Sequence, residues 1–144
     1  MNKASTLTDA ALFLALRDNT LDPDTFDHES HIRLAWIYLT RWPFEEACEQ
    51  FNTDFLRFIV KAGAEGKYHK TITDALLQLI ASHLGPEQCR SDWEFFKADA
   101  GPLFDDAYGL LQRFYSLELL QSDRARTEYA GPDVKAMPKP YQQN

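Results

Sequence analysis

Three histidines stand at the starts of two predicted helices, and their type and position make them the residues best suited to chemistry. His28 and His31 lie in the first turn of a helix predicted over residues 27–41, and His69 opens another predicted over 69–84. Near a helix N-terminus the macrodipole disfavours a positive imidazolium. Because neutral imidazole accepts protons and binds metal ions, these rings are expected in the form that does chemistry.

The helical period predicts that the three rings converge. A repeat of 3.6 residues aligns His28 and His31 with Ala35 and Tyr38 on one face of the helix. In an up-and-down bundle a single antiparallel helix separates the two helices, so these two run parallel and begin at the same end. We therefore expect His28, His31 and His69 to meet around a shared hollow.

Two forms of chemistry fit such a cluster. His28, His31 and His69 can bind a divalent metal ion, zinc or iron, with one position left open for water, and the metal would polarise a substrate or generate hydroxide. Without a metal, the same three histidines can act as catalytic acid and base. In either form Tyr68 and Thr73 would orient a small polar molecule, and Arg126 would bind an anionic group.

A structural interpretation stays open beside these two. Partly buried histidines are often held by hydroxyl groups and loop carbonyls, and a His-x-x-His spacing arises easily by chance. In that interpretation the chain is a non-catalytic helical module that binds a protein partner through its acidic face or an apolar groove.

The rest of the chain predicts an all-α fold of about five to seven helices, some of them short. Apolar residues recur in steps of three and four over residues 43–62, and Gly63 fits the C-terminal cap of that helix. Further helices are predicted over 8–18, 92–99 and 102–114, and Ser116 and Ser122 are expected to cap short ones. We predict one domain over residues 1–133 and an irregular C-terminal tail over 134–144.

Composition narrows the partners and the location. The net charge of −7 disfavours nucleic acid as a partner, and no apolar stretch reaches the roughly 20 residues that span a bilayer. Only Cys48 and Cys89 are present, fewer than a disulfide-stabilised secreted domain usually has. We expect a cytoplasmic protein with a small-molecule ligand; the sequence does not set its oligomeric state.

Several short motifs resemble those of a family of small all-helical bacterial proteins of unknown function. They cover residues 12 to 133 in a fairly specific order. The motifs are Asn19-Thr20-Leu21, Phe26-x-His28-x-x-His31, Trp36-x-Tyr38, Lys67-Tyr68-His69-x-Thr71-Ile72-Thr73, Phe114-Tyr115-Ser116, Ser122-x-x-Ala125-Arg126 and Pro132-Asp133. The resemblance implies the same histidines and names no substrate. The sequence thus favours a small enzyme or ligand-binding protein with a three-histidine site, and the interaction module is the alternative.

Overall fold

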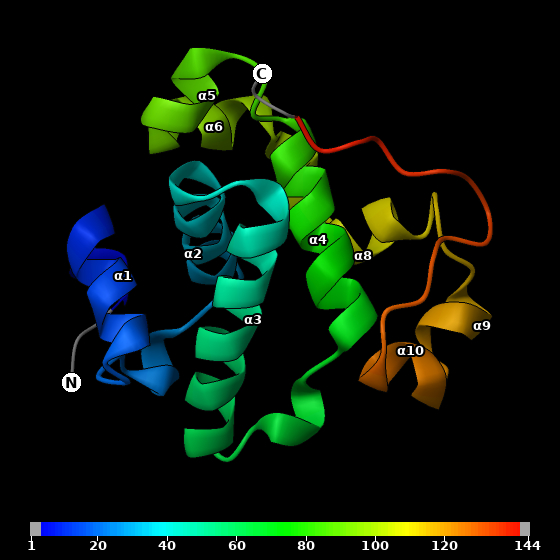
Figure 1. Cartoon of the computed structure of the whole chain (residues 1–144), viewed down its shortest axis with the longest axis horizontal. Helices are drawn as coiled ribbons and strands as arrows, with labels where there is room; N and C mark the ends of the chain where they lie inside the picture. The colour runs from blue at the N-terminus through cyan, green and yellow to red at the C-terminus, as the bar shows by residue number, and fades with distance from the viewer. Residues whose placement is uncertain (1–3, 142–144) are drawn as a thin grey trace. The chain divides into compact units, whose positions relative to one another are not determined.

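A computed structural model describes residues 4–141, and these residues form α-helices, 3-10 helices and loops without a β-strand. The all-α fold class is therefore confirmed. Contacts divide the chain into two compact units, an N-terminal unit (Met1–Tyr68) and a C-terminal unit (His69–Asn144). Figure 1 shows the first unit in blue to green and the second in green to red. The prediction of one domain over residues 1–133 stays a prediction.

Three α-helices build the N-terminal unit. They are α1 (Asp9–Arg17), α2 (His28–Arg41) and α3 (Phe44–Lys61), with 3-10 turns at Ala4–Thr6, Pro23–Thr25 and Glu65–Lys67. Helices α2 and α3 pack along each other, and α1 contacts both of them. These three helices were predicted from the apolar period and from capping residues, and their bounds agree within two residues.

Local capping explains where these helices begin and end. The Thr8 hydroxyl accepts a hydrogen bond from the Ala11 amide at the start of α1, and Asp27 accepts one from the Ser30 amide at the start of α2. Such caps satisfy amides that have no partner inside the helix. After α3, Gly63 takes a φ of 74°. That left-handed conformation suits glycine and ends the helix as predicted.

A buried carboxylate ties the three helices of the N-terminal unit together. Asp54 of α3 is 5% exposed. Its Oδ2 accepts hydrogen bonds from the Tyr38 hydroxyl of α2 at 2.6 Å and from Arg17 Nε of α1 at 2.9 Å. Its Oδ1 accepts one from Arg57. Burial alone would raise the pKa of Asp54, but the bonds from Tyr38, Arg17 and Arg57 outweigh it and hold the pKa below its usual value.

The C-terminal unit begins with one longer helix and continues with short ones. Helix α4 (Lys70–Ser82) is followed by α5 (Glu87–Ser91), α6 (Trp93–Asp99), α7 (Gly101–Asp105), α8 (Ala107–Leu111), α9 (Leu117–Leu120) and α10 (Asp123–Thr127). Helices α8 and α10 pack against α4. The hydroxyls of Ser116 and Ser122 cap α9 and α10, as predicted.

The predicted number of helices was too low, because residues 4–141 form ten α-helices. The segment predicted as one helix over 102–114 is two, divided at Asp106. Asp106 has φ −159° and ψ 77°, which is outside the helical region, and its carboxylate caps α8 through the Gly109 amide. The hydrogen bond from the Gly109 amide to Asp106 thus divides the helix, although the apolar period continues on both sides of Asp106.

Beyond α10 the chain is irregular and lies against the rest of its own unit. Residues 128–141 contain no helix or strand. The amides of Val134 and Lys135 both donate to the Phe114 carbonyl, and the Tyr141 amide donates to the Ala81 carbonyl of α4. The described part of the predicted tail is thus without regular structure but is bonded to α4 and to the residues after α8.

We expect Asp54→Asn to lower the free energy of unfolding by about 2–3 kcal/mol, because it weakens a buried carboxylate that two arginines and a tyrosine share. The control is Glu49→Gln on the exposed side of α3, expected to change the free energy of unfolding by less than about 0.5 kcal/mol.

The folded pKa of Asp54 is lowered, so its stabilisation is present at neutral pH and is lost as the pH falls below about 4. Urea denaturation between pH 7 and 3 measures both effects; equal acid sensitivity in Asp54→Asn and the wild type would contradict the assignment.

Candidate functional site

His28 is the first residue of α2 and is exposed. The preceding Asp27 forms the cap of the helix, and its Oδ1 accepts hydrogen bonds from both the amide and the hydroxyl of Ser30. His28 therefore lies at the surface of the N-terminal unit, beside a carboxylate that is already engaged in holding the helix start.

His31 lies one turn further along, in a stack of aromatic rings. Its imidazole is stacked on Phe55, with ring centroids 4.7 Å apart, and on Phe51, with centroids 5.8 Å apart. The ring of Phe26 is 6.0 Å away. Desolvation by these rings, with a smaller effect from His28, lowers the pKa of His31 from 6.5 to about 4.

The low pKa limits the ability of His31 to accept a proton. At neutral pH the ring is uncharged, as the sequence predicted, but it is a weak proton acceptor, since a general base works best with a pKa near the operating pH. In the part of the chain that the structure describes, the ring nitrogens of His31 form no hydrogen bond. The environment therefore suits hydrogen bonding to a ligand, or simple packing, better than proton abstraction.

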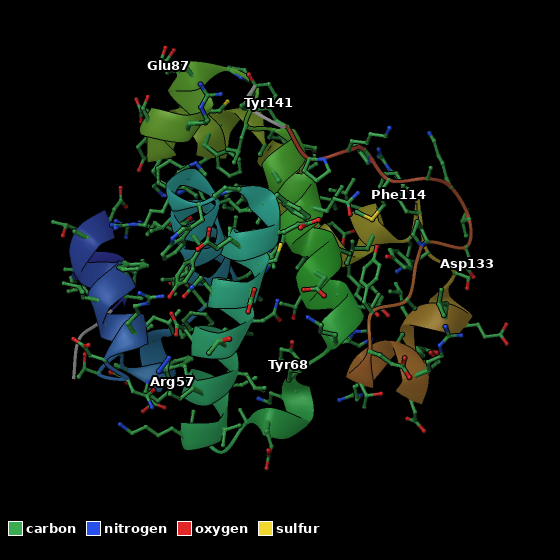
Figure 2. All side chains as sticks on the ribbon, viewed as in Figure 1. Arg57, Tyr68, Glu87, Phe114, Asp133 and Tyr141 are labelled. Carbon is green, nitrogen blue, oxygen red and sulfur yellow. The ribbon has the colours of Figure 1, made fainter. Side chains whose placement is uncertain are left out.

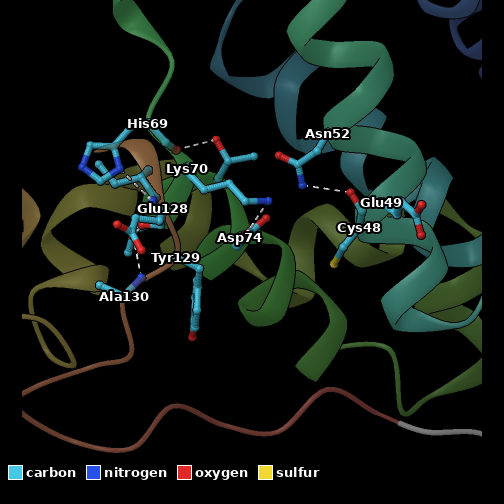
Figure 3. A network of polar contacts seen from close by, with 12 residues as sticks. Cys48, Glu49, Asn52, His69, Lys70, Asp74, Glu128, Tyr129 and Ala130 are labelled. Atoms are coloured by element: carbon cyan, nitrogen blue, oxygen red, sulfur yellow. Dashed lines mark hydrogen bonds and ion pairs between the residues drawn. The ribbon is translucent and has the colours of Figure 1, made fainter. Parts of the chain in front are cut away.

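Tyr68, predicted to bind substrate, is bonded inside the N-terminal unit. Its hydroxyl donates to Asn52 Oδ1 at 2.6 Å, and the Asn52 amide donates to the Cys48 carbonyl at 2.8 Å. The second of these bonds is drawn in Figure 3. Tyr68 is half-buried and its ring lies 6.4 Å from Phe55. It thus contacts the same aromatic group as His31.

His69 opens the C-terminal unit, and both of its ring nitrogens are used. Nδ1 accepts a hydrogen bond from the Ile72 amide at 3.0 Å, which makes His69 the N-cap of α4. Nε2 lies 2.7 Å from the Leu120 carbonyl. Because an amide only donates and a carbonyl only accepts, the ring must be neutral with its proton on Nε2. Binding a metal or moving a proton would require breaking one of these bonds, so the geometry opposes the catalytic and metal-ligand roles predicted for His69.

The threonines of α4 are also engaged with the backbone. The hydroxyl of Thr73, predicted to orient a substrate, donates to the His69 carbonyl at 2.8 Å, and Thr73 is only 4% exposed. Thr71 donates to the Glu128 carbonyl at 2.9 Å and accepts from the Ala130 amide at 3.0 Å. Figure 3 shows Glu128 and Ala130 beside the first turn of α4. Thr73 is therefore a structural residue of this turn.

Arg126, the predicted anion-binding residue, lies in the last turn of α10 and is exposed. It belongs to the C-terminal unit with His69 and Thr73, whereas His28, His31 and Tyr68 belong to the N-terminal unit. Each unit is described by itself, so the convergence of the three histidines stays a prediction. Within residues 4–141 no group of three or more His, Cys, Asp or Glu side chains is placed to hold a metal ion.

Sequence reasoning missed the polar contacts that hold the C-terminal unit together. Asp133 accepts hydrogen bonds from the Ser116 amide at 2.7 Å and the Ser116 hydroxyl at 2.6 Å, and the buried Tyr115 hydroxyl donates to the Ala130 carbonyl at 2.9 Å. Figure 2 labels Asp133 and the neighbouring Phe114. The motifs Phe114-Tyr115-Ser116 and Pro132-Asp133 contain the residues that form these bonds, so the sequence did hold a signal for them.

One hollow in the C-terminal unit has a volume of about 370 Å³ and lies over α6 and α7. It is open to solvent and contains none of the residues predicted to form a site. Its lining residues are Glu94, Lys97, Ala98, Gly101, Phe104 and Asp105. No convergent set of bonding groups in it points to a ligand.

Comparison with protein-family models gave no match to the chain, and searches of curated proteins and of solved structures also gave none. The resemblance of the histidine motifs to a bacterial family therefore stays a prediction. None of the helices in the described residues combines the length and apolar character needed to cross a membrane.

We expect His69→Ala to lower the free energy of unfolding by about 2–3 kcal/mol, because it removes the cap of α4 and leaves the Leu120 carbonyl without its donor. His69→Asn keeps a capping side chain but is too short to serve both partners, so we expect it to lose about half as much. Thermal and urea denaturation of the three proteins checks this order. Unchanged stability in His69→Ala would show that the ring is free for another role.

The lowered pKa of His31 predicts a pH dependence in a separate range. Below pH 6.5 the unfolded chain gains a proton on His31 and the folded chain does not, so stability falls from pH 6.5 towards 4, by about 1–3 kcal/mol. His31→Phe keeps the aromatic stack and removes the titrating group. We expect its unfolding free energy to be equal to or above that of the wild type at pH 7 and to change less over this range. Guanidinium denaturation at stepped pH measures this, and a parallel decline in both proteins would refute it.

Proposed function

We propose that the chain is a non-catalytic helical protein-interaction module whose histidines maintain the fold. The observation that carries this proposal is the pair of hydrogen bonds made by His69, one to the Ile72 amide and one to the Leu120 carbonyl. A ring with both nitrogens bonded to the backbone has no free lone pair for a metal and no free site for a proton. This favours the structural alternative over the three-histidine enzyme.

Two of the other predicted site residues, Thr73 and His31, support the same conclusion. The Thr73 hydroxyl is bonded within its own helix, and His31 is a weak base among phenylalanine rings. Residues that the sequence predicted to be catalytic or substrate-binding therefore form hydrogen bonds to the backbone or pack in an aromatic core. Structural roles for His31, His69 and Thr73 are expected of an interaction module that has no catalytic site.

Exposed apolar side chains supply surface for a partner. On α3, Leu56 and Val60 are 40% and 48% exposed and lie one turn apart, so they share a face of the helix. In the C-terminal unit, Leu117, Val134 and Tyr141 are also exposed. Exposed apolar surface of this kind is a feature of protein-binding faces when it is contiguous. The acidic charge makes a protein a better candidate partner than nucleic acid.

A location in the cytoplasm belongs to the same proposal. Cys48 and Cys89 form no disulfide within residues 4–141, and a chain that functions in an oxidising compartment would more often use its cysteines as a disulfide. Cys89 is buried, and burial together with Asp99 raises its pKa, so this thiol is unreactive.

One observation favours a second candidate, a protein that binds a small polar ligand at His31. The ring nitrogens of His31 have no hydrogen-bond partner among the described residues, and the ring itself is stacked on Phe51 and Phe55 with Phe26 nearby. An imidazole that is neutral and unbonded can donate and accept at one site. In this candidate the histidine serves recognition without catalysis.

Titration of the full chain with Zn²⁺ and, anaerobically, with Fe²⁺ separates these candidates from the three-histidine enzyme. We expect no saturable one-to-one binding by calorimetry at pH 7, because His69 has no free nitrogen and no ligand group of three is assembled in residues 4–141. The matched variants are His28→Ala, at an exposed position, and His69→Asn, which keeps the helix cap.

One metal ion per chain, lost in both variants, would overturn the proposal and restore the three-histidine centre. The ligand candidate is tested by thermal shift with small polar molecules on the wild type and on His31→Phe, because a ligand that binds only the folded state raises the melting temperature. Stabilisation of the wild type alone would favour the second candidate, and stabilisation of neither protein favours the interaction module.

A further inference from the structure

The end of the C-terminal unit is held the way a bound peptide is held. Residues 134–141, named here the C-terminal segment, run from Phe114, past Gln78 and Ala81 of α4, to Arg90 of α5 (Figure 1, red). The Val134 and Lys135 amides donate to the Phe114 carbonyl, and Gln78 Nε2 donates to the Pro138 carbonyl at 2.9 Å. These bonds fix main-chain atoms whatever the side chains are, which is how receptors hold extended peptides.

Two side chains supply the specific contacts of the C-terminal segment. Met137 is 9% exposed, although its neighbours Ala136 and Pro138 are exposed. Four residues later the ring of Tyr141 lies under the Arg90 guanidinium, 5.3 Å from ring centroid to Cζ, and beside Gly85. Figure 2 labels Tyr141 at this end of the segment. Tyr141 is 44% exposed, so Met137 is the buried anchor of the segment and the Tyr141 ring is a surface contact. A peptide on its receptor is likewise held by a few anchoring side chains among exposed ones.

The residues just before the segment are held by side-chain hydrogen bonds. The Ala130 amide and carbonyl are bonded to the hydroxyls of Thr71 and Tyr115, and Asp133 accepts two hydrogen bonds from Ser116. After Asp133, no helix or strand is formed as far as residue 141. Segments with few buried contacts and no regular structure open at low free energy while the rest of a domain stays folded. We therefore expect opening of the segment to begin after Asp133.

We propose that the surface of α4 and α5 beneath the C-terminal segment is a peptide-binding site that the chain's own segment occupies and can vacate. This rests on the proposed function and names its partner: an extended, proline-containing peptide with a methionine and, four residues on, a tyrosine. The segment carries Lys135 and Lys139 and no acidic residue, whereas the chain has a net charge of −7, so the partner peptide is basic.

The consequence is that the free protein inhibits itself. A partner must compete with a covalently linked occupant present at high effective concentration, so the observed affinity is reduced by the fraction of time the site is empty. Weakening the anchor of the chain's own segment should therefore raise affinity for a peptide added in trans.

The test uses the full chain and a fluorescent peptide with the sequence of residues 131–141. We expect the Met137→Ser chain to bind this peptide at least about tenfold more tightly than the wild-type chain does, measured by anisotropy. The matched control is Ala136→Ser, at the exposed neighbouring position, expected to bind as the wild type does. A peptide that carries Met137→Ser should bind none of the three chains.

Hydrogen exchange on the same proteins separates release of the segment from unfolding. In Met137→Ser we expect faster exchange of the Val134, Lys135 and Tyr141 amides and unchanged exchange in α4. If exchange in α4 also accelerates, Met137 is part of the core and the proposal fails. Equal binding of the two peptides, or of the peptide to all chains, also overturns it. Neither failure touches the proposed function, which the metal titration tests independently.

Discussion

Helices of four or five residues leave most of their backbone amides and carbonyls without hydrogen-bond partners inside the helix. The structure of the C-terminal unit depends on side chains that supply those partners. The side chains that do so come largely from the start of α4 and from the turns around α9 and α10. His69 serves one amide of its own helix and the Leu120 carbonyl at the end of α9, and the Thr71 hydroxyl serves two backbone groups after α10. An unmade bond at any of these buried groups costs about 1–3 kcal/mol, which exceeds what a helix of this length contributes by itself.

The two units meet the same physical requirement by different means. The N-terminal unit has two longer helices, α2 and α3, and its buried polar contacts meet at one carboxylate, Asp54. The C-terminal unit has only short helices after α4 and distributes its polar contacts over Thr71, Tyr115, Ser116 and Asp133. A binding function therefore depends on surface residues that these internal hydrogen bonds do not use.

Much of the fold could be predicted from the sequence, because the apolar period of α1 to α4 and the capping residues Asp27, Ser116 and Ser122 are local signals. The division at Asp106 could not, since the apolar period continues through it. The site was harder still. Position at a helix start predicted the neutral form of His31, but the roles of His31 and His69 depend on partners distant in sequence. These are Phe51 and Phe55 for His31, and Leu120 for His69.

The carboxylate of Asp54 also bears on how the N-terminal unit comes apart. Its three donors come from α1, α2 and α3, so no one of these helices can leave alone without stripping a buried negative charge of a partner. A partly unfolded form with α1 detached would keep Asp54 inside and lose Arg17. Such a form is disfavoured, and we therefore expect α1, although only nine residues long, to unfold together with the two longer helices in one cooperative step.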